Sequence, residues 1–173
     1  MPSIRTYNGG RVDFLDPKPE QFTITDIARG LSNTCRYSGQ IPFHYSTGQH
    51  SVLMTRRARP EHKLATLLHD APEAYLGDPV KELKPLLPDY AAIEKRFHLA
   101  ICKRFDLDPV FPPEVKELDR LICADEIRAL WSEDHPIKKT PGLDIGIVEW
   151  TPRETYAAFM REFAAIKRTL IAC

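Results

Sequence analysis

The sequence lacks an excess of charge of either sign. Its 173 residues include 24 Lys and Arg against 24 Asp and Glu. General binders of nucleic acid or of anionic membranes carry a surplus of basic residues, so this balance argues against both classes, although it leaves room for a local basic pocket. We therefore expect neither nucleic acid nor a membrane among the partners of the protein.

Long apolar runs are also missing. No stretch approaches the length of a membrane span, and residues 1–14 contain no continuous apolar segment of the kind found in signal peptides. Cysteine is scarce and without pattern, because the four residues at 35, 102, 123 and 173 form no CxxC pair. These absences predict a cytoplasmic protein with reduced thiols.

What the chain does have is helical periodicity over most of its length. The length fits one domain with a real core, spanning residues 1–173. Near the N-terminus, Asn8-Gly9-Gly10 supplies the positive φ angles of a tight turn and predicts a hairpin over residues 4–15. Helices are expected over 26–37 with Thr25 as its cap, from Ser46 or Thr47 through residue 58, and over 60–70, 89–105, 114–131 and 151–170.

The remaining segments are joints between these helices. Residues 134–146 are expected to form a loop, and residues 147–150 could extend as a strand. The fifteen prolines fall mostly between the helical segments, as suits a compact arrangement of short connections. The fold class predicted is a compact all-α bundle with a small N-terminal β-hairpin.

A carboxylate interrupts the apolar stripe of the helix predicted over 114–131. Asp125 lies three residues after Ile122 and four before Ala129, which places it within that stripe. Burying an ionised carboxylate without a partner costs several kcal/mol, so Asp125 needs a partner. The alternatives are a structural ion pair with a buried arginine, protonation of the carboxyl group, and a bound cation.

Two histidines raise the same question. His50 lies on or beside the inward face of its helix, and His69 follows two leucines with Asp70 next to it. Each alone can be a satisfied core residue. Together with Asp125 they form a set of two imidazoles and two carboxylates, which suits Zn, Mn, Fe, Co or Ni and can leave coordination positions open to water.

The order His50, His69-Asp70, Asp125 resembles that of the HD-domain metal-dependent phosphohydrolases, in particular the 5′-deoxynucleotidase branch. The segments QHSVLM, LLHDAPEAYLGDPVK and CADEIRAL are similar to the family segments that carry the histidines and the final aspartate. CRYSG is similar to the segment with an Arg-Trp pair that precedes the metal site. The resemblance covers about residues 25–135 and implies a compact HD-domain helical bundle.

The resemblance implies a metal site and a catalytic acid. One divalent transition metal, of unknown identity among Co, Mn, Zn, Fe and Ni, would be held by four side chains: His50, His69, Asp70 and Asp125. Glu73 would orient the attacking water or carry a proton. A surface role for Glu73 stays open, because sequence cannot show whether it reaches that water.

The resemblance also implies a substrate site. Arg36 would bind the phosphoryl group as a bidentate fork, Lys81 would add a point charge, and Asp78 would contact the sugar 3′-hydroxyl. Lys81 could equally be a solvated residue, and Asp78 could cap a helix that begins at Pro79. Tyr37 replaces the tryptophan of the family pattern, so preference for deoxyribose over ribose is an open question.

Hydrolysis of the 5′-phosphate ester of a (deoxy)nucleoside monophosphate is the function that we expect from this resemblance. One alternative is a (deoxy)nucleoside triphosphate triphosphohydrolase, such as a dATPase that releases tripolyphosphate. Others are a metal- and nucleotide-binding sensor without catalysis, and an all-α scaffold with an accidental His-Asp pair. The amphipathic C-terminal helix could serve a homo-oligomer interface or complete the core.

Overall fold

The computed structural model describes residues 2–132 and 134–172. Seven α-helices and one small sheet make up its regular structure, with short 3₁₀ turns between them. The helices are α1 (Ile24–Asn33), α2 (Thr47–Thr55), α3 (Lys63–Leu68), α4 (Glu73–Leu76), α5 (Pro88–Phe105), α6 (Pro113–Leu130) and α7 (Pro152–Ala172). The prediction of an all-α domain with an N-terminal hairpin is confirmed.

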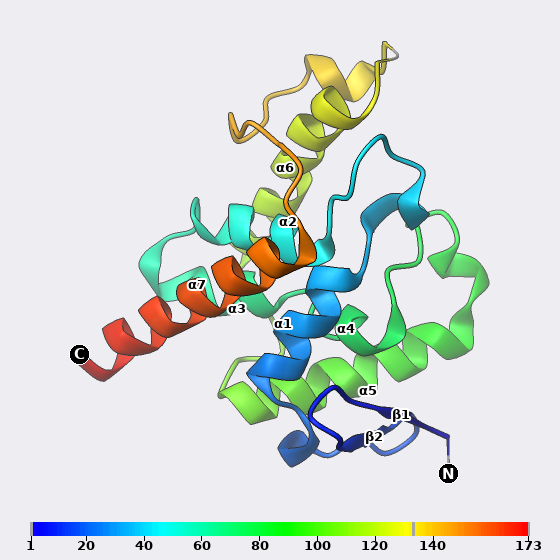
Figure 1. The fold of residues 1–173 in the computed structure, drawn as a ribbon, viewed down its shortest axis with the longest axis vertical. Helices are drawn as coiled ribbons and strands as arrows, with labels where there is room; N and C mark the ends of the chain where they lie inside the picture. Colours follow the sequence, from blue (N-terminus) through cyan, green and yellow to red (C-terminus); the bar gives the residue numbers. More distant parts are fainter. Residues whose placement is uncertain (1, 133, 173) are drawn as a thin grey trace.

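The hairpin pairs strand β1 (Ser3–Arg5) with β2 (Arg11–Asp13) in antiparallel register, Ile4 opposite Val12. Gly9 takes a φ of 85° in the turn, a conformation that glycine adopts without strain. The hairpin lies at one end of the molecule, and the end of α6 with the segment that follows it lies at the other (Figure 1).

Both ends of α1 differ from the sequence prediction, and α2 ends at Thr55, before the predicted residue 58. α1 begins at Ile24 because Thr23, rather than Thr25, accepts a hydrogen bond from the Asp26 backbone. It stops at Asn33, since the Arg36 backbone N–H donates to the Tyr45 carbonyl at 3.0 Å and pulls the chain into an extended bridge. Residues 36–39 then form a 3₁₀ turn.

The other differences concern the joints. The helix predicted over 60–70 is split into a 3₁₀ turn at Pro60–His62 and α3 at Lys63–Leu68. Residues 147–150 adopt no strand; the segment lies as an irregular chain against α2. No helix within the described part of the chain is both long enough and apolar enough to span a bilayer.

α2 lies between two apolar clusters, and all nine of its residues are buried. The first cluster packs Val52 of α2 with α1, α3, α5 and α7, and includes the fully buried Phe97 and Phe159. The second packs Leu53 and Met54 of α2 against α6 and the segment after it. A helix covered on all sides buries its polar residues too, which is why a histidine on α2 can be shielded from water.

One glycine sets the approach of α4 to α1. A Cβ built on Gly30 would overlap the backbone and side chain of Ala74. The glycine thus lets α4 pack directly on α1, and this contact places the chain that runs from His69 to Gly77.

Candidate metal centre

His50 is presented by α2 with both ring nitrogens in polar surroundings. The side chain is fully buried. Nδ1 lies 2.6 Å from Oε1 of Glu126, and Nε2 lies 3.3 Å from Oδ1 of Asp119 and 3.8 Å from Oδ2 of Asp70. Because a carboxylate can only accept, Nδ1 donates to Glu126 and Nε2 is free for another partner.

His69 follows the last residue of α3 and has the same arrangement. Its Nδ1–H donates to the backbone carbonyl of Thr66 at 2.7 Å, so the lone pair of the neutral ring is on Nε2. That Nε2 lies 3.0 Å from Oδ2 of Asp70. The two imidazole rings are tilted by 41° to each other, with centroids 5.3 Å apart.

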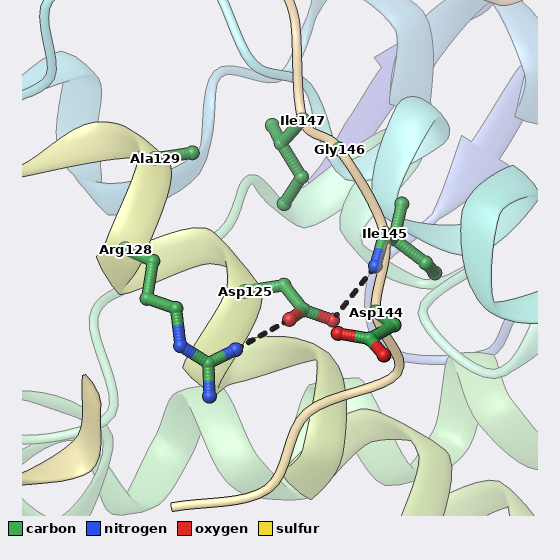
Figure 2. Close-up of a pocket in the computed structure, with 7 residues that line it drawn as sticks. All are labelled: Asp125, Arg128, Ala129, Asp144, Ile145, Gly146 and Ile147. Atoms are coloured by element: carbon green, nitrogen blue, oxygen red, sulfur yellow. Dashed lines mark hydrogen bonds and ion pairs between the residues drawn. The ribbon is translucent and has the colours of Figure 1, made fainter. Parts of the chain in front are cut away.

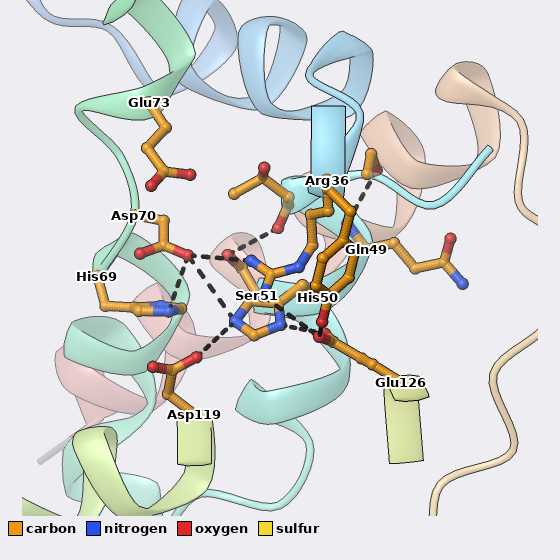
Figure 3. Close-up of polar contacts among 12 residues, drawn as sticks. Arg36, Gln49, His50, Ser51, His69, Asp70, Glu73, Asp119 and Glu126 are labelled. Atoms are coloured by element: carbon orange, nitrogen blue, oxygen red, sulfur yellow. Dashed lines mark hydrogen bonds and ion pairs between the residues drawn. The ribbon is translucent and has the colours of Figure 1, made fainter. Parts of the chain in front are cut away.

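The third element of the site is α6, which contributes Asp119. One ligand atom each from His50, His69 and Asp119 lies within 4.8 Å of the other two. Asp70 adds a carboxylate oxygen beside both histidines. Figure 3 shows the four side chains converging from three separate segments of the chain.

Asp125 is not part of this cluster, so the prediction that it is the fourth ligand is wrong. Its Oδ1 pairs with Nη1 of Arg128 at 2.6 Å, and its Oδ2 accepts from the backbone N–H of Leu143 at 2.7 Å. Asp125 is thus paired with an arginine, as the sequence left open, but Arg128 is exposed and not buried. Asp125 fastens the segment after α6 to that helix, beside an open pocket of about 500 Å³ (Figure 2).

The donor set fits a divalent transition metal. Nε2 of His50 and Nε2 of His69 are both buried and make no hydrogen bond in the described structure. Buried polar atoms without partners are rare, and here two of them face the same carboxylates. Two imidazoles and two carboxylates suit Zn, Mn, Fe, Co or Ni, and each histidine donates its other N–H, as metal-binding histidines do.

The pKa shifts of the two histidines indicate a site that favours positive charge. Burial lowers the pKa of His69, but the adjacent Asp70 carboxylate outweighs it and raises the pKa to about 9. For His50, burial and Arg36 lower the pKa, and Glu126 and Asp119 raise it further than that, so its pKa is also above the usual value. Both imidazoles therefore favour a proton wherever no other cation neutralises these carboxylates.

Glu73 follows His69 by four residues, at the start of α4, and is almost completely buried. Burial, together with the charges of Asp70 and Asp78, raises its pKa to about 9. Oε1 accepts from Nζ of Lys84 at 3.2 Å, whereas the buried Oε2 has no hydrogen-bond partner among the described residues. A carboxyl group in this state can hold a proton near neutral pH and release it to a neighbour.

A pocket of about 390 Å³ opens beside these groups. It is smaller than the pocket at Asp125, which contains none of the candidate ligands. Titratable side chains gather in the smaller one, so it is the better candidate for a substrate site. Its lining residues include His69, Asp70, Glu73, Lys84, Glu94 and Lys95.

Of the predicted substrate residues, Arg36 and Asp78 lie near Asp70, whereas Tyr37 contacts Glu126. Arg36 is nearly buried, with Nη1 3.8 Å from Oδ2 of Asp70. Asp78 is close enough for Asp70 to raise its pKa, after the larger effect of burial and against the charge of Arg36. Tyr37 donates its hydroxyl to Glu126 and packs edge-on against Trp131, with ring centroids 4.8 Å apart.

Lys81 is exposed, and no ion pair involving it is found within the described residues. Lys84, which the sequence left without a role, lines the pocket instead. Its ammonium group lies 3.2 Å from Glu73 and 3.0 Å from Glu94.

Two functional candidates were missed on α6, although a signal for both was present. Asp119 lies four residues after Val115 and three before Ile122, and Glu126 lies four residues after Ile122 and four before Leu130. Both therefore share the apolar stripe by the same helical spacing that pointed to Asp125. Glu126 is fully buried, as this spacing indicates, whereas the Asp119 side chain is partly exposed. The spacing does not show which neighbour each carboxylate contacts.

Comparison with known proteins gives a family. No family model matches the chain. "Uncharacterized protein YfdR" of Escherichia coli (strain K12) is 33% identical over 168 residues, an alignment that covers 94% of each chain. The chain belongs to the YfdR family. Because the alignment with YfdR omits so little of the chain, it takes in α2, α3 and α6 with all the candidate ligands.

A second relative of this YfdR-family protein covers a shorter part of it. "Uncharacterized protein RCAP_rcc00048" of Rhodobacter capsulatus is 38% identical over 135 residues. That alignment covers 72% of this chain and 68% of the relative.

Proposed function

We propose that this protein is a metal-dependent phosphohydrolase of the HD type, acting on the 5′-phosphate ester of a (deoxy)nucleoside monophosphate. The observation that carries the proposal is the pair of buried Nε2 atoms of His50 and His69. They lie 3.3 Å from Asp119 and 3.0 Å from Asp70, and they make no hydrogen bond to any described residue. Arg36 and Glu73, an arginine and a buried acid, lie beside them.

Four side chains of this chain would hold the ion: His50 and His69 through Nε2, and Asp70 and Asp119 through their carboxylates. A bound divalent cation supplies a lowered water pKa and polarisation of a phosphate oxygen. The fixed Nδ1–H donors of both histidines support this assignment, because they leave each Nε2 aimed inward before any ion arrives.

The remaining groups would handle the phosphate and a proton. Arg36 offers a planar guanidinium for the non-bridging oxygens, on which charge gathers in the transition state. Glu73 would hold a proton at its unpartnered Oε2 and pass it at the reacting oxygen. Asp78 remains our candidate for a sugar hydroxyl, and Lys84 replaces Lys81 as the lysine at the pocket.

A single phosphate group suits the charges of the pocket better than three. Lys84 is already paired with Glu73 and Glu94, so few cations stay free for additional phosphates. Triphosphate hydrolysis is the second candidate, because Lys95 also lines the pocket and has no carboxylate within ion-pair distance in the described structure.

The test is phosphate release from ribo- and deoxynucleoside mono- and triphosphates with Co²⁺ or Mn²⁺. We expect orthophosphate from a monophosphate, lost in Asp70→Ala and kept in Asp125→Asn. Tripolyphosphate as product would favour the second candidate. Metal binding without turnover of any nucleotide would favour a sensor, and no metal binding would favour a scaffold; either result would contradict the proposed enzyme.

A further inference from the structure

A single buried carboxylate, that of Glu126, joins the two halves of the candidate site. The residue is fully buried on α6, and its oxygens are surrounded by donors. Oε1 accepts from Nδ1 of His50 at 2.6 Å and from the Tyr45 hydroxyl at 2.9 Å. Oε2 accepts from Nη2 of Arg36 at 3.3 Å and from the Tyr37 hydroxyl (Figure 3).

These four donors match the acceptor capacity of an ionised carboxylate. A carboxylate offers about four lone-pair sites, and a proton on either oxygen would displace one of the donors. Burying such a charge is costly unless it is paired and fully hydrogen-bonded, and both conditions hold here. The group is therefore fixed in position and in charge.

The four partners belong to different parts of the proposed machinery. His50 is a proposed metal ligand, and the bond at Nδ1 sets both its tautomer and the direction of Nε2. Arg36 is the proposed phosphate-binding group, and the bond at Nη2 turns Nη1 toward Asp70. The bond from Tyr37 helps to hold a residue with a φ of 56°, a conformation that costs free energy unless its surroundings enforce it.

We propose that Glu126 is a positioning residue that holds His50 for the metal and Arg36 for the phosphate at once, so that the two binding events share one anchor. This inference rests on the proposed function for the role of Arg36. Its part concerning His50 depends only on a metal being bound. Glu126 contacts neither ion nor substrate in this account and acts through the two residues that do.

Asp125 provides a matched control, because it is the preceding residue on the same helix and its carboxylate meets other partners. Glu126→Gln leaves the side chain nearly the same size but replaces two acceptor sites with an NH₂ group. Asp125→Asn makes the same chemical change toward Arg128 and Leu143. Co²⁺ titrations of both variants, with melting temperatures recorded, separate a positioning effect from a general loss of structure.

In Glu126→Gln we expect the Kd for Co²⁺ to rise about 10- to 100-fold, the usual effect of losing the partner of a metal-binding histidine. At saturating Co²⁺, the Kd for inorganic phosphate should rise about tenfold, as expected for loss of one charge-assisted hydrogen bond to Arg36. Asp125→Asn should change neither Kd. Equal metal and phosphate affinities in Glu126→Gln and wild type would overturn the proposal.

A measurement on the wild type keeps the inference testable if Glu126→Gln does not fold. Long-range ¹H–¹⁵N correlation spectra of the Zn²⁺-loaded protein report which nitrogen of each histidine carries the proton. We expect His50 protonated at Nδ1, with Nε2 perturbed by the metal. A proton on Nε2, or metal at Nδ1, would overturn the proposal.

Failure of this inference is distinguishable from failure of the proposed function. Wild-type turnover together with unchanged affinities in Glu126→Gln removes only the positioning role. If the wild type binds Co²⁺ without turnover and Glu126→Gln loses that binding, the role of Glu126 toward His50 stands and the proposed enzymatic activity is contradicted.

Discussion

Asp125 and Glu126 are consecutive residues on α6, both almost completely buried, and their carboxylates serve different regions of the molecule. Asp125 pairs with Arg128 and holds the backbone of the following segment at Leu143. Glu126 meets His50, Arg36 and two tyrosine hydroxyls. Neighbours on a helix point about 100° apart, so one fastens a loop and the other faces the candidate metal centre.

A buried carboxylate must therefore be paired or hydrogen-bonded, but burial alone does not show that it is a metal ligand. On this helix the candidate ligand is Asp119, whose carboxylate is the least enclosed of the three. Partial access is consistent with a ligand group, because an ion has to enter and exchange water.

The largest expected effect comes from removing that ligand. Asp119→Asn should lower Co²⁺ affinity by more than the about 100-fold that loss of an outer partner costs, because it removes a donor to the ion itself. Metal titration and initial rates measure the effect. If Asp119→Asn bound Co²⁺ like wild type and Asp125→Asn did not, the two residues would exchange roles.

Metal affinity should also depend strongly on pH. The metal-free protein holds a proton on His69 below its pKa of about 9, and the ion must displace that proton from Nε2. Affinity should therefore rise with pH by about tenfold per unit for each proton released, and level off above about pH 9. Calorimetry in buffers of different ionisation enthalpy counts the protons. No proton release between pH 6 and 8 would contradict the assignment of His69.

For Asp125, on the other side of α6, we expect a substitution to lower the stability of the fold and to leave metal binding unchanged. Asp125→Ala should lower the free energy of unfolding by about 1–3 kcal/mol, because it removes the acceptor of the Leu143 N–H and of Nη1 of Arg128. Denaturant unfolding measures the loss, and a Co²⁺ titration of the same variant should match wild type. A weakened Co²⁺ site would mean that the two faces of the helix are coupled.

The smallest expected effect comes from a change beside the ion pair of Asp125 and Arg128 that leaves both charges in place. A Cβ on Gly142 would overlap Oδ1 of Asp125 and lie 2.7 Å from Nη1 of Arg128. Gly142→Ala should therefore destabilise the fold by about 1 kcal/mol, at the low end of overpacking costs. Thermal unfolding is the measurement. A melting temperature at or above that of wild type would show that Asp125 and Arg128 can move away from the added methyl group without loss of stability.

Much of the fold could be predicted from the sequence because its signals are local. Helical periodicity and prolines placed α5, α6 and α7 correctly, and the Asn8-Gly9-Gly10 turn gave the hairpin. The end of α1 could not be predicted this way, since it depends on a hydrogen bond between Arg36 and Tyr45, nine residues apart.

The candidate site was predictable in part for the same reason. His50, His69, Asp70, Glu73 and Arg36 lie together as the motif order suggested. Helical spacing pointed to Asp125 alone on α6 and missed Asp119 and Glu126, because the partner of each carboxylate depends on which distant segment covers that face of the helix. The loop that reaches back to Asp125, and the turn that brings Arg36 and Tyr37 to Glu126, are tertiary contacts.

The most direct test of the central claim is the location of the ion. Anomalous diffraction from crystals grown with Co²⁺ or Mn²⁺ should give a peak between Nε2 of His50 and Nε2 of His69, with carboxylate oxygens of Asp70 and Asp119 bound to it. A peak held by Asp125, or none at saturating metal, would contradict the account.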